Sequence, residues 1–162
     1  MKKIEFSTTI ECLESYLDLE DSDEVRLCEA TFKALEHSYA PYSEYRVGAA
    51  VLLDNGQLVE GSNQENAVFP LGLCAERVAI FSANTSYPKS KIRTVAVITA
   101  KEVSENELPG FPCGSCRQVM IDMEDRHNRS IRILILAPDG RTYIVQSAKD
   151  LLPFAFADKD LR

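Results

Sequence analysis

Three cysteines in two short segments have the residue types and spacing of a metal site. Cys74 opens the segment 74–77 (CAER), and Cys113 and Cys116 lie in the segment 112–118 (PCGSCRQ). Each segment is predicted to open a helix, where the positive end of the helix dipole favours the thiolate that zinc requires. Residues three apart in a helix share one face, so Cys113 and Cys116 can bind one ion, and Cys74 supplies a third ligand.

Three protein ligands leave the fourth tetrahedral position of zinc open, which is typical of a catalytic site. No fourth ligand is evident, because His37 and His127 are far from the cysteine segments in sequence and are expected to be solvated. Glu76 lies two residues after a ligand, where a carboxylate can move protons beside the metal. By position alone Glu76 would be an acid that complements a helix dipole; beside three candidate ligands, catalysis is favoured.

A zinc ion with three thiolates carries a net negative charge, which a neighbouring cation would offset. Arg77 and Arg117 each follow a candidate ligand closely. We assign the contact with thiolate sulfur to Arg77. The alternative is that Arg77 is a cation on the helix surface.

Length and composition indicate how many domains the chain forms and where in the cell the protein is expected. The 162 residues have the length of one ordinary domain, and 45% are hydrophobic, which suffices for a core without disulfides. No apolar run is long enough to span a membrane, and the N-terminus lacks a signal peptide, so we expect a cytoplasmic protein. Thiols stay reduced there, and the five cysteines then indicate metal binding or catalysis.

The charge of the chain argues against one class of partner. Twenty-five acidic residues against eighteen Lys and Arg give a formal net charge of -7. Because nucleic-acid affinity comes largely from cations that neutralise phosphates, DNA and RNA are disfavoured as partners. No basic stretch with interleaved aromatic residues is evident either.

The elements that must position these residues alternate between strand and helix patterns. Apolar runs and period-two patterns predict strands over 4–12, 45–53, 57–61, 95–99, 131–136 and 142–145. Helical spacing predicts helices from 22 to 39, near 74 and over 113–124. This order favours a mixed sheet with helices on both faces, in which sites form where strands end and helices begin.

The two cysteine segments together match a known signature. Cys-x-x-Cys alone is shared with redox motifs and zinc knuckles, but Cys-x-Glu followed by Pro-Cys-x-x-Cys is the three-cysteine variant of the deaminase signature. The segments 40–43 (APYS), 47–50 (VGAA), 63–67 (NQENA) and 151–153 (LLP) also agree. From about residue 39 to the C-terminus, the chain resembles the small, homotetrameric, zinc-dependent cytidine deaminases.

That resemblance implies a fold and an activity. The fold would be α/β, a three-layer α/β/α sandwich with a mixed, mostly five-stranded core sheet, and residues 1–22 would add an N-terminal extension with an extra edge strand to a single domain over 1–162. The activity would be hydrolytic deamination of cytidine and deoxycytidine to uridine and deoxyuridine, with release of ammonia, in pyrimidine salvage. One Zn²⁺ per chain would activate water for attack on C4, while Glu76 moves the protons.

The resemblance also implies roles for residues outside the metal site. Asn63 and Glu65 would hold the ribose hydroxyls, since an amide and a carboxylate supply both donors and acceptors. Tyr45 would stack on the pyrimidine, where the family usually has Phe. Backbone groups near Ala75 would hold the edge of the base.

The family is homotetrameric, which implies contacts between subunits. Phe156 resembles a C-terminal aromatic residue that reaches a neighbouring active site, although core packing is an equal alternative. Phe69 stands where relatives often have Tyr, so a hydroxyl contact is lost. Cys12 and Cys28 lie outside the motifs and are expected to be small, buried apolar residues.

Three other functions remain open at this point. The chain could deaminate another cytosine compound, such as a nucleoside antibiotic or a mononucleotide. Nucleic-acid deamination is disfavoured by charge. A structural zinc or thiol-redox module would need a fourth protein ligand or reversible oxidation of Cys113 and Cys116, and it would leave Glu76 unexplained.

Overall fold

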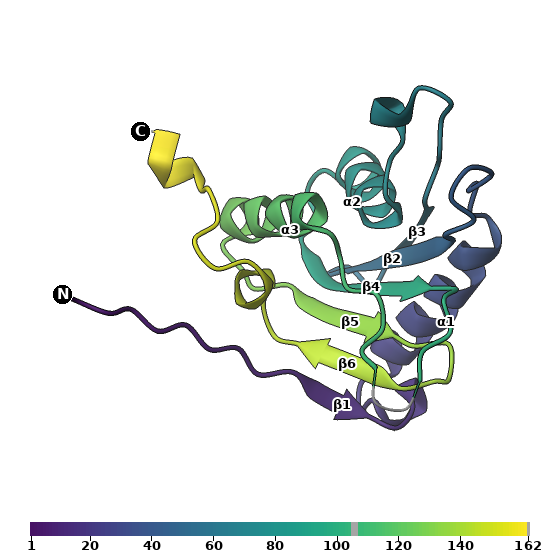
Figure 1. Cartoon of the computed structure of the whole chain (residues 1–162), viewed down its shortest axis with the longest axis horizontal. Coiled ribbons are helices and arrows are strands. Elements are labelled where there is room, and N and C mark those ends of the chain that lie inside the picture. The colour runs from purple at the N-terminus through teal and green to yellow at the C-terminus, as the bar shows by residue number, and fades with distance from the viewer. Residues whose placement is uncertain (105–106, 162) are drawn as a thin grey trace.

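The computed structural model describes residues 1–104 and 107–161, which form one six-stranded sheet and three α-helices (Figure 1). The strands are β1 (Glu11–Leu13), β2 (Val47–Leu53), β3 (Leu58–Ser62), β4 (Ile92–Thr99), β5 (Arg132–Leu136) and β6 (Thr142–Val145). The helices are α1 (Ser22–Glu36), α2 (Ala75–Ser86) and α3 (Gly114–His127). Short 3-10 turns are η1 (Tyr16–Asp18), η2 (Phe69–Leu71), η3 (Ala148–Leu151) and η4 (Asp158–Leu161).

The sheet is mixed, with the strand order β1-β6-β5-β4-β2-β3. β4 and β5 pair in parallel, and the other neighbours are antiparallel. A parallel pair needs a crossover, and α3 supplies it between β4 and β5. The expected core of five strands with an added N-terminal edge strand is confirmed.

Helices cover both faces of the sheet because the strand residues alternate in direction. In β2, Ala49 and Val51 pack in the core under α2 and α3, whereas Ala50 and Leu52 pack in the core under α1. Figure 1 shows α1 on one side of the sheet and the other two helices together on the opposite side. The expected three-layer α/β/α sandwich is confirmed.

Two glycines allow the helices to approach the sheet closely. A Cβ at Gly48 would stand 2.5 Å from the backbone nitrogen of Leu35 in α1. A Cβ at Gly61 would stand 2.5 Å from the nitrogen of Ala79 and 2.6 Å from the carbonyl oxygen of Ala75, both in α2. Any residue larger than glycine at either position would therefore clash with the backbone of the helix above it.

The N-terminal strand is shorter than the sequence predicts. The period-two pattern over 4–12 predicts a long strand, but residues 1–10 lie outside any strand, and Ile4 and Phe6 are exposed. β1 pairs only with residues 142–144 of β6, so the earlier residues have no neighbouring strand with which to form hydrogen bonds. The prediction that Cys12 is buried is also wrong, because this residue lies on the edge strand and is exposed; Cys28 is fully buried as expected.

The first helix and the strand after it are also shorter than the sequence predicts. α1 ends at Glu36, not near Tyr39, and β2 begins at Val47, not at residue 45. Tyr39 leaves the helix and forms an isolated bridge, in which its N–H donates to the Asn63 carbonyl (3.0 Å) and its carbonyl accepts from Glu65 (2.9 Å). This bridge holds the loop before β2 over the segment that follows β3.

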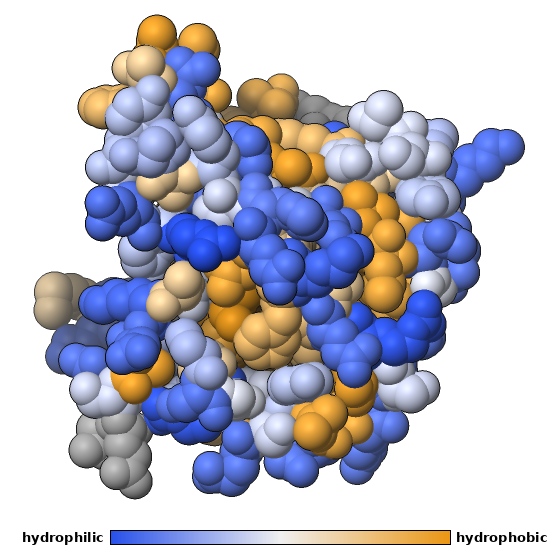
Figure 2. Space-filling view, turned by 90° about the vertical axis from the view of Figure 1, so that its right-hand side faces the viewer, coloured by the Kyte–Doolittle hydropathy of each residue, from blue (hydrophilic) through white to orange (hydrophobic). Residues whose placement is uncertain are grey.

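Hydrophilic residues cover much of the side shown in Figure 2, with smaller groups of apolar side chains exposed between them. Three large apolar residues around η2 are exposed: Val68, Phe69 and Leu71. Within the described residues, no helix is both long and apolar enough to cross a membrane.

Candidate metal centre and active site

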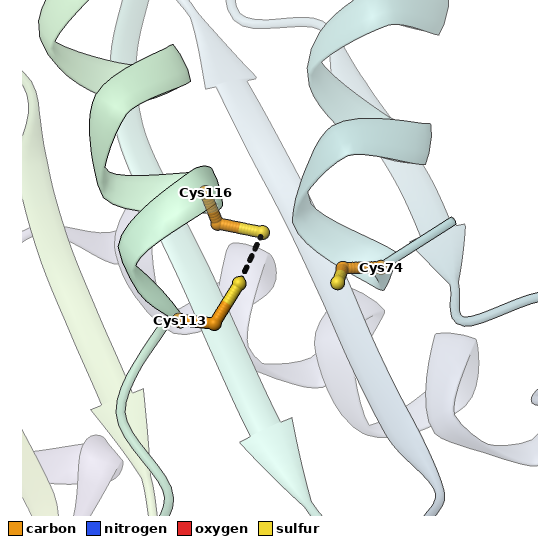
Figure 3. A group of neighbouring side chains, drawn as sticks. All are labelled: Cys74, Cys113 and Cys116. Carbon is orange, nitrogen blue, oxygen red and sulfur yellow. Dashed lines mark hydrogen bonds between the residues drawn. The ribbon is translucent and has the colours of Figure 1, made fainter. Parts of the chain in front are cut away.

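Three thiols meet where two helices begin. Cys74 is the N-cap of α2, Cys113 is the N-cap of α3, and Cys116 lies in the first turn of α3. Their side chains converge in Figure 3, and the three sulfur atoms lie within 4.8 Å of one another, with 3.6 Å between those of Cys113 and Cys116. The expectation that both segments present thiols at helix N-termini is confirmed.

The three sulfurs fit a zinc ion. Zinc binds thiolates at about 2.3 Å in a tetrahedron, which separates the sulfur atoms by about 3.8 Å. The three sulfur atoms, all within 4.8 Å of one another, are close to that spacing. In the described part of the chain this is also the one group of three or more ligand side chains, so a bound ion would keep an open position.

Neither histidine joins the thiols. His37 is exposed, as expected. His127 is half-buried, contrary to expectation, and its Nδ1 accepts a hydrogen bond from the backbone of Ile92 (3.3 Å). Burial lowers the pKa of His127, and the cations of Arg126 and Lys91 lower it further. This histidine therefore ties the end of α3 to the start of β4.

Electrostatics concentrate negative charge on one thiol. A hydrogen bond from Cys116 lowers the pKa of the Cys74 thiol, and the guanidinium of Arg77 lowers it further, against the opposing effect of burial. Sharing its proton with Cys74 raises the pKa of Cys116, as does burial. Nη2 of Arg77 lies 3.4 Å from Sγ of Cys74, so a cation faces the thiol whose pKa is lowered.

Glu76 is buried beside the thiols in the first turn of α2, with 4% of its surface exposed. Burial raises the pKa of its carboxyl, and the charge at Cys74 raises it further, while a backbone hydrogen bond, the Cys116 thiol and Arg77 lower it. A carboxyl with a raised pKa holds a proton more readily than an exposed one, which suits a group that must accept a proton and pass it on.

A pocket of about 210 Å³ connects these groups to the loops around β2 and β3. It is lined by Ser43, Tyr45, Val47, Asn63, Glu65, Cys74, Glu76, Val97, Thr99, Gly110, Phe111 and Cys113. Six residues that the sequence singled out are among them: Tyr45, Asn63, Glu65, Cys74, Glu76 and Cys113. Four others are not among them: Ala75 and Cys116, which are both fully buried, Arg77 and Phe156.

The side chain of Asn63 is nearly saturated with hydrogen bonds. Its Oδ1 accepts from the Ser38 hydroxyl (2.5 Å) and from the Val47 N–H (2.9 Å). Its Nδ2 donates to the Tyr45 carbonyl (2.8 Å). A carboxamide has two donor hydrogens and two acceptor positions, so one N–H is left for a ligand. Through these bonds Asn63 also holds the backbone of Tyr45 and Val47, which line the pocket.

The carboxylate of Glu65 is similarly engaged. Oε2 accepts from the backbone N–H groups of Tyr42 (2.9 Å) and Ser43 (3.2 Å), and Oε1 accepts from the Ser43 hydroxyl. The hydrogen bond from the Ser43 side chain and that from the Tyr42 backbone lower the pKa of this carboxyl. It therefore stays ionised, with one acceptor position on Oε1 remaining.

The pocket contains a buried hydroxyl that sequence reasoning missed. Oγ1 of Thr99 is buried without a hydrogen-bond partner in the described residues. A Cβ at Gly110 would stand 2.5 Å from the Tyr45 hydroxyl and 3.2 Å from this Oγ1, so only a glycine fits between the two side chains. The position of Thr99 at the carboxyl end of a predicted strand was the signal that could have identified it.

Two aromatic residues that the sequence singled out, one near the C-terminus and one in a loop, lie outside this pocket in the single chain. Phe156 is exposed, and its carbonyl accepts a hydrogen bond from Gln118 (2.7 Å). Phe69 is also exposed, and its ring packs edge-on against that of Tyr42 with 5.7 Å between centroids.

The fold and the thiol centre together define the class: an α/β/α protein with a three-cysteine zinc site and a buried carboxyl beside it. Comparison with known proteins identifies the family. Residues 21–129, more than half of the chain, match the family model described as the cytidine and deoxycytidylate deaminase zinc-binding region. The chain belongs to this family.

Individual relatives agree over most of their length. A cytidine deaminase of Halalkalibacterium halodurans is 35% identical over 139 residues, which span 86% of this chain and 98% of the relative. One of Sporosarcina psychrophila is 37% identical over 86% of this chain and 95% of the relative. The crystal structure of cytidine deaminase from Burkholderia pseudomallei has a TM-score of 0.70 and 38% identity, covering 81% of this chain and 97% of that one.

Proposed function

We propose that this protein hydrolyses cytidine and 2′-deoxycytidine to uridine and 2′-deoxyuridine, with release of ammonia. The observation that carries the proposal is a buried carboxyl, Glu76, beside three converging thiols, at a pocket that Asn63 and Glu65 also line. The relatives named above as cytidine deaminases support the same reaction.

The residues of the chain divide the work of this reaction. Cys74, Cys113 and Cys116 would hold a zinc ion, which when bound would supply activation of water at neutral pH. Glu76 carries one proton to N3 of the cytosine and a second to the leaving amine, which its raised pKa favours. Arg77 offsets the negative charge of three thiolates through Cys74.

The spare hydrogen-bonding groups of Asn63 and Glu65 indicate how the sugar is held. One donor remains on Asn63 and one acceptor on Glu65, and a single hydroxyl both accepts and donates. We therefore assign one sugar hydroxyl to the pair. If both nucleosides are substrates, that hydroxyl must be one that ribose and deoxyribose share, and the kcat/KM values for the two should agree within about tenfold.

The base would enter between Tyr45 and the thiols. The ring of Tyr45 lines the pocket and can pack on a pyrimidine as a phenylalanine would. Backbone groups near Ala75 remain our proposed contact with the edge of the base. Val47 and Val97 add apolar surface to the same cavity.

Two competing functions have less support. The family description includes deoxycytidylate, but the ionised Glu65 would repel a nearby phosphate. A structural or redox centre is compatible with the 3.6 Å between Cys113 and Cys116, yet it gives no role to a buried Glu76 in an open pocket.

The assembly, the domain organisation and the location are part of the proposal. Exposed apolar residues around η2, beside the pocket residues Ser43 and Glu65, support a homotetramer in which Phe156 contacts a neighbouring subunit's site. We retain a single domain over 1–162 with an extension over 1–22. A cytoplasmic location is supported by the need to keep ligand thiols reduced.

The experiment that tests the function follows the loss of cytidine absorbance with purified wild-type protein, Glu76→Gln and the exposed control Glu36→Gln, with zinc measured in each. We expect turnover with wild type and Glu36→Gln, and a fall on the order of 10²- to 10⁴-fold with Glu76→Gln at unchanged zinc content. Zinc without turnover of either nucleoside in wild type would contradict the substrate, and absence of zinc would contradict the reaction. Sedimentation of the same samples tests the tetramer.

A further inference from the structure

We propose that Arg117 is a positioning residue that couples the seating of the C-terminal segment, residues 147–157, to the zinc ligand Cys113. The inference rests on the zinc centre but assigns a role that the deamination chemistry does not require.

Arg117 brackets Cys113 on both sides. Its backbone N–H donates to the carbonyl of Cys113 (3.0 Å), and its Nε donates to the carbonyl of Pro112 (2.6 Å). The peptide group before the ligand and the carbonyl after it are therefore held by the same residue. Since Cys113 is the N-cap of α3, these two contacts hold the backbone from which its sulfur projects toward Cys116.

The same guanidinium also contacts the C-terminal segment. Its Nη1 donates to the carbonyl of Leu151 (2.8 Å), at the end of η3. The planar arginine fork thus joins the loop that carries Cys113 to the segment that leads to Phe156. No carboxylate among the described residues forms an ion pair with Arg117, and the partners of its Nε and Nη1 are both backbone carbonyls.

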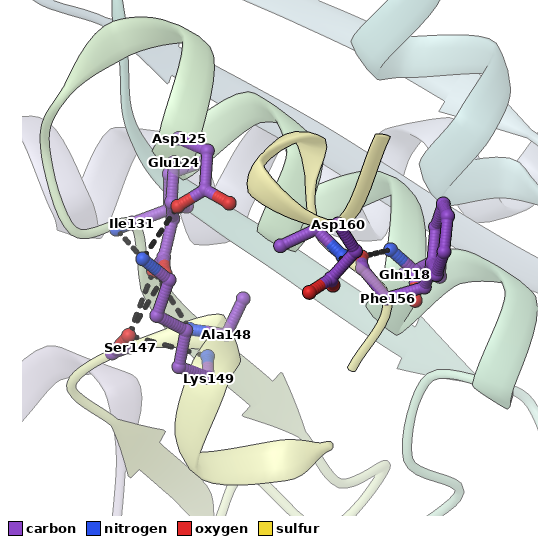
Figure 4. Close-up of polar contacts among 10 residues, drawn as sticks. Gln118, Glu124, Asp125, Ile131, Ser147, Ala148, Lys149, Phe156 and Asp160 are labelled. Carbon is purple, nitrogen blue, oxygen red and sulfur yellow. Dashed lines mark hydrogen bonds and ion pairs between the residues drawn. The ribbon is translucent and has the colours of Figure 1, made fainter. Parts of the chain in front are cut away.

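Other side chains of α3 anchor the same segment without contacting the ligand loop. Gln118 donates to the Phe156 carbonyl (2.7 Å), and the buried carboxylate of Glu124 accepts from the Ser147 hydroxyl (2.9 Å) (Figure 4). These contacts bind the segment to the helix, whereas Arg117 binds it to the helix and to the ligand loop at once. Loosening the segment at Leu151, where Arg117 holds it, should therefore disturb Cys113, whereas loosening it at Phe156 alone should not.

The two arginines that follow the cysteine ligands act in different ways. Arg77 approaches the sulfur of Cys74, so its effect depends on charge. Arg117 bonds to carbonyls, so its effect depends on geometry, and a lysine that keeps the charge should not replace it. We therefore expect Arg117→Lys to behave like Arg117→Met.

Coupling of this kind is reciprocal: if the seated segment favours zinc binding, zinc must favour the seated segment. In wild type, added zinc should slow amide hydrogen exchange in the peptide 147–157 more than in a reference peptide from α1, which lies on the opposite face of the sheet. In Arg117→Met and Arg117→Lys, zinc should bind on the order of tenfold more weakly, and this extra protection should be lost.

The experiment measures zinc affinity by competition with a chromophoric chelator, and hydrogen exchange by mass spectrometry with and without zinc. Gln118→Ala is the matched control, because it should speed exchange near Phe156 while keeping the zinc-dependent protection and the zinc affinity. Equal zinc protection of 147–157 and α1 in wild type would overturn the proposal without any variant. Unchanged zinc affinity in both Arg117 variants would overturn it too. A wild type that binds no zinc would instead remove the metal centre itself.

Discussion

Some side chains in this pocket both face the space for a ligand and hold the surrounding backbone in place. Asn63 offers one N–H to a ligand, while its other groups hold the Ser38 hydroxyl and the backbone of Tyr45 and Val47. Replacing Asn63 would therefore remove the proposed substrate contact and a support of the pocket wall together. Arg77 is simpler, because the hydrogen bond found for it goes to the Cys74 sulfur.

Arg77→Gln should weaken zinc binding and lower kcat, since the thiolate charge on Cys74 loses its cation. A hydrogen bond to a charged group contributes about 1.5–3 kcal/mol, which corresponds to about a 10- to 100-fold loss of zinc affinity. Chelator competition and steady-state kinetics measure the two effects. Arg26→Gln on α1, an exposed arginine paired with Asp23, is the control. Full zinc affinity and activity in Arg77→Gln would contradict the assigned role.

At the scale of elements, the metal centre depends on how closely α2 approaches β3. Gly61 makes that approach possible, since its missing Cβ leaves room for the backbone of Ala75 and Ala79. Ala75 directly follows the ligand Cys74, so the helix start and the ligand move together. Gly48 does the same for α1, which carries none of the ligands.

Gly61→Ala and Gly48→Ala should both destabilise the fold, by about 1–3 kcal/mol each, because overpacking forces the helix backbone to shift. Only Gly61→Ala should also weaken zinc binding, since it moves the start of α2. Denaturant unfolding and chelator competition on the pair measure these effects. Equal zinc affinities in the two variants would show that the approach of α2 does not set the ligand geometry.

At the scale of the whole molecule, the N-terminal extension contributes one short edge strand. β1 covers the outer edge of β6, whereas residues 1–9 are exposed and Ile10 packs against the core. An uncovered strand edge can pair with other chains and lead to aggregation. The extension therefore protects the sheet through its last few residues rather than through its whole length.

Removing residues 1–9 should leave deamination unchanged and shift Tm by no more than about 2 °C, because little buried surface is lost. Removing residues 1–13 should lower Tm further and cause aggregation, because the edge of β6 is then uncovered. Thermal unfolding and size-exclusion chromatography of the two truncated chains compare them. A large loss of stability on removing residues 1–9 alone would mean that the first residues pack against something in the assembled protein.

The sequence by itself identified the three thiols that converge, the carboxyl beside them and most of the elements. These follow from local patterns: a thiol before a helix, a second thiol one turn later, and apolar periods that match strands or helices. Cys74, Glu76, Cys113 and Cys116 were identifiable because each lies beside the helix start that orients it. The family resemblance added Tyr45, Asn63 and Glu65, which do line the pocket.

Only the tertiary structure decided which distant groups meet. The period-two pattern over 4–12 predicts a strand, but a strand forms only where a neighbour can pair with it, and β6 offers partners to residues 11–13 alone. The bridge at Tyr39 and the partners of Asn63 join segments far apart in sequence. The reach of Arg117 to Leu151 is of the same kind. Local periodicity records which face of an element is buried, whereas these contacts depend on where the chain returns.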